Sequence, residues 1–354
     1  MLFLHKNEIS LLPDAIGHCT QVYEMTLSNN KLSSIESICS LNKLTKFTCN
    51  GNYLSNIPQD ISKLTNLKLL EFYGNVITSL PSSVGELTNL NYLLLNLNEI
   101  DEIPSSFSKL TNLVKFYIQH NMLMRIPPEI GYLTNLVELY IGYNHIYQLP
   151  TQIGNLTHLS SLYAQNNELT FLPPELSQLT ALGRLILQSN RLAYFPSVIT
   201  CLTKLSILAL GGNFISRIPT SITALKSLEL LSLVKSGITD LPHEIGQLTL
   251  LRELRLAENK LEYLPPEIGQ ITNLKGLDLS HNQLVSVPTD LGNLRNVEFM
   301  TLFHNQIAAV PLELANLPSQ SLMSGTTKMI AQPFEERNEE VEFLRVQRDL
   351  YYDS

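Results

Sequence analysis

The sequence predicts an α/β solenoid, a curved stack of short coils in the form of a horseshoe, and two observations predict it. Asparagine recurs every 23 residues, with one step of 22. Each asparagine closes a phrase of alternating apolar residues, L-x-L-x-x-N-x-L/I, as in LYIGYNHI at residues 139–146. The recurring asparagines are Asn7, Asn30, Asn52, Asn75, Asn98, Asn121, Asn144, Asn167, Asn190, Asn213, Asn259, Asn282 and Asn305.

The strand of each repeat is the stretch before its asparagine. Around Leu162 the apolar residues alternate with a period of two, so side chains face opposite sides of a strand. Successive strands stack in parallel about 4.8 Å apart, which predicts a parallel sheet on the concave face. This phrase at a period of 20–29 residues is the leucine-rich-repeat signature, and about fourteen units of 22–23 residues carry it. A repeat array counts as one domain, so we expect a single repeat domain over 1–318.

The turn after each strand holds the asparagine. Its side chain has donors and an acceptor, so it can satisfy buried backbone groups of its own coil and of the next. The sequence therefore predicts a polar ladder inside an apolar stack. At Ser236 the asparagine is replaced by a shorter side chain, which cannot reach all the same partners.

The return segment of each repeat follows a proline that fixes φ, as at Pro127 and Pro150. The phrase Ile-Gly-x-Leu-Thr then runs along the convex side, where glycine eases the bend. We expect short helical or 3₁₀ turns on this convex face.

The two ends depart from the repeat. The first phrase begins at Met1, so we expect the domain to start mid-repeat without an N-terminal cap, and we interpret the chain as truncated. Residues 319–354 form a charged C-terminal tail. Pro333 suits a helix start and acidic residues follow it, so a helix that caps the last coil is expected. A solvated tail or a linker to another domain is the alternative.

Composition excludes several classes of partner. A net charge of −8 opposes nucleic acid or an anionic membrane surface as the partner. Neither an apolar run of 18 residues nor a signal peptide is present, so no direct membrane insertion is expected. The four cysteines do not cluster as disulfide caps do, which indicates a reducing, cytoplasmic location. Cys19 and Cys49 occupy apolar positions of the repeat and are expected to be buried.

The concave face is where we expect function. Positions four residues before each asparagine point outward from the sheet, and in the middle repeats they are apolar or aromatic. Gly142 should leave a flat gap beside them. Exposed apolar patches mark interfaces and tyrosine is enriched there, although neighbouring rings also simply support one another across strands. The predicted protein-binding residues are Tyr73, Tyr92, Leu94, Tyr117, Tyr140, Tyr143, Tyr163 and Ile186, with a rim of Glu71, Lys115, Glu138 and Arg184.

No residue pattern indicates catalysis, a cofactor or a metal. The polar residues around Arg255 and Asp278 are interpreted as a solvated sheet surface, because no pocket should enclose them. His120 and His145 lack a third ligand for zinc. Phosphate-binding loops and hydrolase or kinase motifs are absent from the sequence. We therefore predict a protein that is not an enzyme.

The phrases IPPEIGYLTNL at 126–136 and LPPEIGQITNL at 264–274 resemble those of the Ras-group intracellular leucine-rich-repeat proteins. That group includes a Ras/protein-phosphatase scaffold and plant intracellular proteins. The resemblance implies a cytoplasmic scaffold or adaptor in signal transduction, which binds a protein partner, such as a Ras-type GTPase or a phosphatase, on its concave face. The alternative is the sensor region of a larger signalling enzyme: a kinase, a Roco GTPase or an adenylyl cyclase.

Overall fold

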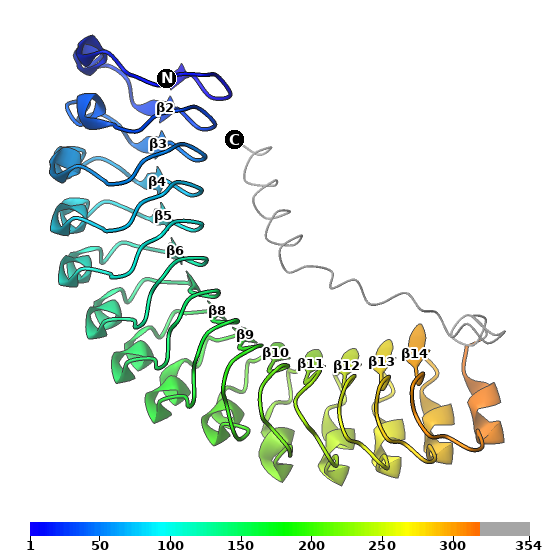
Figure 1. Cartoon of the computed structure of the whole chain (residues 1–354). Helices are drawn as coiled ribbons and strands as arrows, with labels where there is room; N and C mark the ends of the chain where they lie inside the picture. The colour runs from blue at the N-terminus through cyan, green and yellow to red at the C-terminus, as the bar shows by residue number, and fades with distance from the viewer. Residues whose placement is uncertain (319–354) are drawn as a thin grey trace.

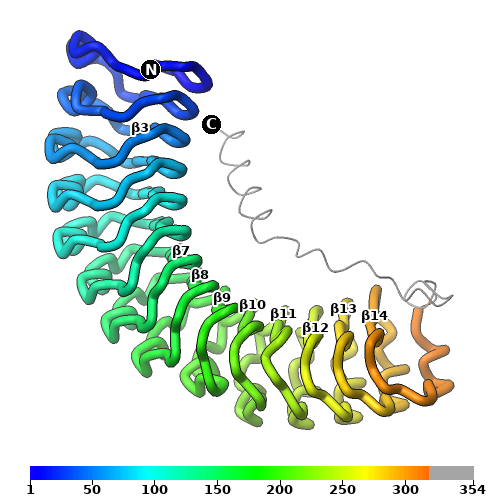
Figure 2. Tube along the Cα trace, in the orientation of Figure 1, coloured from blue at the N-terminus to red at the C-terminus, as the bar shows by residue number. Residues whose placement is uncertain are grey.

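A computed structural model describes residues 1–318, which form an open, curved solenoid of stacked coils (Figures 1 and 2). Strands line the inner side of the arc and short 3₁₀ segments line the outer side. The predicted fold class is confirmed. The tail over 319–354, with its expected capping helix, lies outside the described residues.

A single parallel sheet of fourteen strands follows the chain order without a crossover. Each strand is only two or three residues long because the chain must turn at the asparagine. The strands are β1 (Leu2–Phe3), β2 (Glu24–Thr26), β3 (Lys46–Thr48), β4 (Leu69–Glu71), β5 (Tyr92–Leu94), β6 (Lys115–Tyr117), β7 (Glu138–Tyr140), β8 (Ser161–Tyr163), β9 (Arg184–Ile186), β10 (Ile207–Ala209), β11 (Leu230–Ser232), β12 (Glu253–Arg255), β13 (Gly276–Asp278) and β14 (Phe299–Thr301).

Each return segment contains one 3₁₀ turn on the convex side. From the third repeat onward the turn begins directly after a proline whose backbone is extended, as at Pro150 (φ −70°, ψ 151°). The segments are η1 (Asp14–His18), η2 (Glu36–Ile38), η3 (Gln59–Lys63), η4 (Ser82–Glu86), η5 (Ser105–Lys109), η6 (Pro128–Tyr132), η7 (Thr151–Asn155), η8 (Pro174–Gln178), η9 (Ser197–Cys201), η10 (Thr220–Ala224), η11 (His243–Gln247), η12 (Pro266–Gln270), η13 (Thr289–Asn293) and η14 (Leu312–Asn316).

The core is one continuous apolar column between the sheet and the 3₁₀ turns. The middle residue of each interior strand points into it, as Leu139 and Leu162 do with no exposed surface. Phenylalanine widens the column in two places: Phe47 packs edge-on against Phe72, and Phe107 packs against Phe116. Because every coil buries its leucines against two neighbours, stability comes from stacking rather than from any single unit.

The asparagine ladder is present, but it runs in the opposite direction to our expectation. The Asn144 side chain donates to carbonyls of its own coil, such as Ile141 O at 3.1 Å, and to Ile118 O of the preceding coil at 3.1 Å. Its Oδ1 accepts the N–H of Leu123, also of the preceding coil, at 3.0 Å. Each rung therefore joins its coil to the one before it.

Ser236 interrupts the ladder. Its Oγ reaches only the carbonyl of Val234, at 3.5 Å. The preceding coil's Ile215 is fully buried and occupies the place from which other coils donate to the asparagine. Among the described residues, the N–H of Ile215 has no acceptor.

The expectation for the cysteines holds for one of the two residues. Cys49 is fully buried and burial raises the pKa of its thiol to about 12, whereas Cys19 is exposed. Cys19 lies in the first coil, where a neighbour covers only one side. None of the helical segments of residues 1–318 is long and apolar enough to cross a membrane.

Candidate protein-binding face

Parallel pairing aligns the third residues of the middle strands into one column on the concave face. Leu94, Tyr117, Tyr140, Tyr163 and Ile186 are successive register partners from β5 to β9. The tyrosine rings consequently stack along the sheet. Tyr117 and Tyr140 have ring centroids 4.3 Å apart at an interplanar angle of 13°, and Tyr140 and Tyr163 are 4.2 Å apart at 44°.

The exposure of this column differs from the prediction. Tyr117 is 1% exposed, and Leu94 and Ile186 are buried as well. Tyr117 is stacked against the ring of Tyr140 on the next strand. Tyr140 and Tyr163 are half-buried. We therefore correct the view that all three tyrosines project freely: Tyr117 is the packed base on which the more accessible rings rest.

The outer positions of β6 and β7 carry an ion pair next to these rings. Lys115 Nζ lies 3.0 Å from Glu138 Oε1, and both side chains are about three-quarters buried. The other carboxylate oxygen of Glu138 accepts a hydrogen bond from the hydroxyl of Tyr117. Glu138 therefore lies inside the tyrosine cluster rather than on its rim.

Burial keeps the tyrosine hydroxyls protonated. The pKa of Tyr117 is raised, first by burial and then by neighbouring Tyr140 and Glu138. The pKa of Tyr140 is raised mainly by burial, against the opposing effect of Arg184. At neutral pH the rings accordingly offer neutral hydroxyl groups to a partner.

Glu71, the last residue of β4, accepts a hydrogen bond from a neighbouring coil. Burial raises the pKa of its carboxyl group, and a 2.8 Å hydrogen bond from Asn50 partly offsets that rise. Tyr73, whose backbone N–H donates to the same Asn50 side chain, is half-buried.

Two further rings project from the turns before the asparagines. Tyr143 and His120 both have a left-handed backbone, with φ of 54° and 55°, which turns their side chains out of the sheet. The rings stack at 4.0 Å and 11°. Tyr143 is 38% exposed, and Tyr92 is exposed to a similar degree. The stacking of His120 on Tyr143 is not predictable from the sequence, because a turn residue falls outside the period-2 pattern.

The gap expected at Gly142 is filled. A Cβ at this position would lie 2.8 Å from the side-chain amide of Gln165, so that amide lies over the glycine. Glycine is required here to admit the neighbouring side chain rather than to leave open space.

The polar residues of the C-terminal repeats satisfy one another. Asp278 accepts hydrogen bonds from Ser280 Oγ at 2.7 Å and from Thr301 Oγ1 at 2.5 Å. Arg255 pairs with Glu253 at 2.6 Å. Within residues 1–318, no group of three or more His, Cys, Asp and Glu side chains could hold a metal ion.

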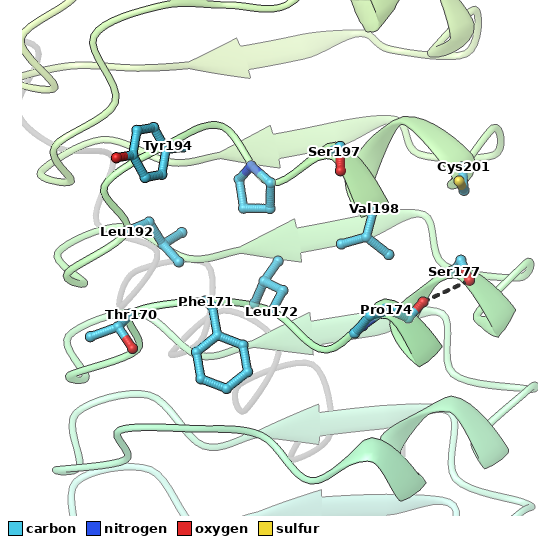
Figure 3. A pocket seen from close by; sticks show the side chains of 11 residues that line it. Thr170, Phe171, Leu172, Pro174, Ser177, Leu192, Tyr194, Ser197, Val198 and Cys201 are labelled. Atoms are coloured by element: carbon cyan, nitrogen blue, oxygen red, sulfur yellow. Dashed lines mark hydrogen bonds between the residues drawn. The ribbon is translucent and has the colours of Figure 1, made fainter.

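A shallow pocket of about 570 Å³ lies on the flank between the eighth and ninth coils (Figure 3). Phe171 and Tyr194 extend from neighbouring coils beside it, 52% and 82% exposed. Ser177 stands where other repeats have glycine, and its hydroxyl donates to Pro174 O at 2.7 Å. The repeat pattern did not predict this pocket because all these positions vary between coils.

Comparisons with known proteins agree with this architecture. A family model for a leucine-rich repeat region matches residues 48–143, and a leucine-rich-repeat model matches residues 249–307. A leucine-rich-repeat protein of Leptospira interrogans is 34% identical, with a TM-score of 0.82, over 85% of this chain and 77% of its own. No curated protein matches. The chain therefore belongs to the leucine-rich-repeat family.

More distant structures share the same coil. The ectodomain of the plant membrane receptor kinase GASSHO1/SCHENGEN3 from Arabidopsis thaliana, in complex with CASPARIAN STRIP INTEGRITY FACTOR 2, is 25% identical with a TM-score of 0.59. That match covers 87% of this chain and 44% of the ectodomain. YopM of Yersinia enterocolitica is 23% identical with a TM-score of 0.61, over 86% of this chain and 59% of its own, and shows the fold alone.

Proposed function

We propose that this protein is a non-enzymatic scaffold or adaptor that holds a protein partner on its concave face. The binding site is the tyrosine face, defined here as Tyr73, Tyr92, Tyr117, Tyr140, Tyr143 and Tyr163 with Lys115, Glu138 and Arg184. The proposal rests mainly on the stack of Tyr117, Tyr140 and Tyr163. Its base is buried while its outer rings remain half-exposed on a rigid sheet. Such rings bury a large area against a partner with little loss of rotamer entropy.

The partner class is proposed from two supports. The repeat phrases resemble those of Ras-group intracellular proteins, which favours a Ras-type GTPase or a protein phosphatase in a cytoplasmic signalling complex. The Arabidopsis receptor ectodomain was solved in complex with CASPARIAN STRIP INTEGRITY FACTOR 2, so partner binding is consistent with a related fold. The apolar and aromatic centre of the tyrosine face, with charges beside it, suits a protein surface rather than nucleic acid.

The test begins with capture of partners on the full chain, with and without added nucleotide-loaded GTPases. The affinity of the recovered protein is then measured for single variants. Tyr140→Ala and Tyr163→Ala should each cost about 2 kcal/mol of binding, roughly thirtyfold, because each ring is a central contact. Gln152→Ala on the exposed convex face is the matched control and should bind normally.

Tyr117 needs a different substitution. Tyr117→Ala would open a cavity in a packed cluster and lower stability, so a loss of binding would be ambiguous. Tyr117→Phe keeps the ring and removes the hydroxyl group that donates to Glu138. If Tyr140→Ala and Tyr163→Ala bind normally while Arg255→Ala and Asp278→Ala abolish binding, the site lies in the polar C-terminal repeats and the proposal is wrong.

The second candidate is the sensor region of a larger signalling enzyme. It is favoured by the similarity to the ectodomain of a receptor kinase, of which the chain covers less than half. Sequencing the full-length transcript separates the two functions, because an attached kinase, Roco GTPase or cyclase domain would replace the scaffold proposal with this one.

A further inference from the structure

The cations of the concave sheet differ in how they are neutralised. Four strand residues are cationic, and three of these have a carboxylate partner. Lys46 lies 3.9 Å from Glu24, Lys115 lies 3.0 Å from Glu138, and Arg255 lies 2.6 Å from Glu253. The fourth is Arg184, at the first position of β9.

Arg184 has no carboxylate partner among residues 1–318. Its Nη1 lies 3.4 Å from Ser161 Oγ, a weak contact with a neutral group. Its register partners on the two flanking strands are Ser161 and Ile207, so neither neighbour supplies a negative charge. The side chain is exposed on the concave side. In a protein of net charge −8, this guanidinium is a local, uncompensated positive charge.

The surroundings of Arg184 are the half-exposed part of the tyrosine face. Its positive charge opposes the rise in the pKa of Tyr140 that burial causes. Tyr163 precedes it by one coil, and Ile186 and Ala209 form a buried apolar floor in the same region. An ion pair formed here would be shielded from solvent by rings, and so would be stronger than one on an open surface.

We infer that the partner segment bound on the tyrosine face places the carboxylate of an Asp or Glu side chain on Arg184. The inference rests on the proposed function. A guanidinium presents two parallel N–H donors to a carboxylate, which fixes the orientation of the acidic residue. Apolar residues beside it in the partner segment would then cover Tyr140 and Tyr163. The recognised segment is thus an acidic residue with apolar neighbours, rather than a basic or uniformly polar one.

The experiment selects peptides on the full chain and tests them against matched variants. A phage-displayed library of 12-residue peptides is panned, and the selected peptides are synthesised with blocked ends. We expect an Asp or Glu with apolar neighbours in these peptides. Arg184→Gln in the protein, or Glu→Gln in the peptide, should each weaken binding at least about tenfold. Combining both changes should weaken it little further, since they remove the same contact.

The control variant is Arg191→Gln, which removes an equal charge from the same coil. Arg191 is exposed on the flank and pairs with Glu168 at 3.1 Å. It should leave peptide affinity unchanged, which separates direct contact from a general loss of positive charge. Thermal melting of both variants should match that of the unaltered chain, because neither side chain is buried.

Three outcomes count against the inference, and they are distinguishable from one another. Peptides that lose affinity for Tyr140→Ala but not for Arg184→Gln leave the proposed function intact and overturn the acidic contact. Peptides whose affinity changes with neither variant count against both the tyrosine face as the binding site and the acidic contact. Phosphoserine in place of Glu, if it binds more than tenfold tighter, shows that a phosphate rather than a carboxylate is recognised.

Discussion

At the scale of single residues, the asparagine side chain determines how each coil is joined to the coil before it. Asn167 donates to Ile141 O of the preceding coil at 3.0 Å and to Ala164 O of its own coil at 3.2 Å, and it accepts the N–H of Ile146 at 2.9 Å. These backbone groups lie in an apolar interior where water cannot replace the side chain. Removing one asparagine therefore leaves several polar groups unpaired at once.

The first prediction compares Asn167→Ala with Gln165→Ala. The loss of Asn167 should lower the free energy of unfolding by about 3 kcal/mol, since buried donors and acceptors are left without partners. Gln165 is half-exposed and its change should cost less than about 1 kcal/mol. Urea unfolding of the two variants measures both values. Equal shifts in the urea midpoint for Asn167→Ala and Gln165→Ala would mean that the asparagine ladder is not the main polar contact between coils.

The second prediction concerns the thiols. Burial raises the pKa of Cys49 to about 12, and burial with nearby carboxylates raises that of Cys39 to about 12. Almost no thiolate forms at pH 8 in either side chain, and neither is accessible. Cys19 and Cys201 are exposed. A disulfide reagent at pH 8 should therefore modify two thiols rapidly in the folded protein and all four after denaturation. Rapid modification of more than two would show that the cysteine environments are different.

Side-chain burial is where sequence reasoning was least accurate at this scale. The repeat phrase correctly placed Tyr117 on the concave side, but not its burial. That burial depends on the stacking of Tyr140 and on the hydroxyl bond to Glu138, which come from other coils. A period-2 pattern indicates which face a residue occupies, and it contains no information on how large neighbours cover one another.

At the scale of elements, glycine allows neighbouring 3₁₀ turns on the convex side to pack closely. A Cβ at Gly154 in η7 would lie 2.5 Å from the backbone oxygen of Glu175 in η8. Gly131 in η6 meets Gln152 of η7 in the same way, at 2.8 Å from its carbonyl oxygen. The conformational freedom of glycine is not what is required at these positions. The absent side chain allows one turn to rest on the backbone of the next.

The third prediction follows from this contact. Gly154→Ala should destabilise the protein by about 1–3 kcal/mol, because the methyl group forces two packed turns apart. Gly183→Ala is the matched control: the nearest atom to its Cβ would be Ser160 O at 3.7 Å, an ordinary contact. Thermal unfolding of the two variants provides the comparison. A Gly154→Ala variant as stable as Gly183→Ala would mean that the turns can separate freely.

The elements themselves were predictable because each has its own signal in nearly every repeat. The asparagine marks the end of a strand, proline marks the start of a 3₁₀ turn, and both recur often enough to exclude chance. The flank pocket was not predictable, because Phe171, Ser177 and Tyr194, which line it, occupy positions that vary between coils. Such sites depend on residues that differ from the repeat consensus, and the consensus pattern contains no information on them.

At the scale of the whole molecule, each coil contacts only its neighbours, so stability is close to a sum over junctions. Within residues 1–318, the ladder is incomplete at the junction before Ser236. In the preceding coil, Leu192 donates to Asn213 Oδ1 at 3.0 Å and accepts from Phe214 N at 2.9 Å. Its counterpart Ile215 makes neither bond within the described residues, and Gly237 N turns instead to Asn259 Oδ1 at 2.9 Å.

The last prediction tests this junction with Ser236→Asn. An asparagine would offer Oδ1 to the N–H of Ile215, and that bond should raise the free energy of unfolding by about 1–3 kcal/mol. Ser216→Asn, which changes an exposed serine of the preceding coil, is the control and should change stability by less than about 0.5 kcal/mol.

Hydrogen exchange adds a local measurement of the same junction. The amide of Ile215 should exchange more slowly in Ser236→Asn than in the unaltered chain, and its rate should not change in Ser216→Asn. Since adjacent junctions are independent of this bond, amides in the first coils should exchange at their original rates. If neither the exchange rate of the Ile215 amide nor the unfolding midpoint changed in Ser236→Asn, the serine would not weaken this junction, and the junction would be as stable as its neighbours.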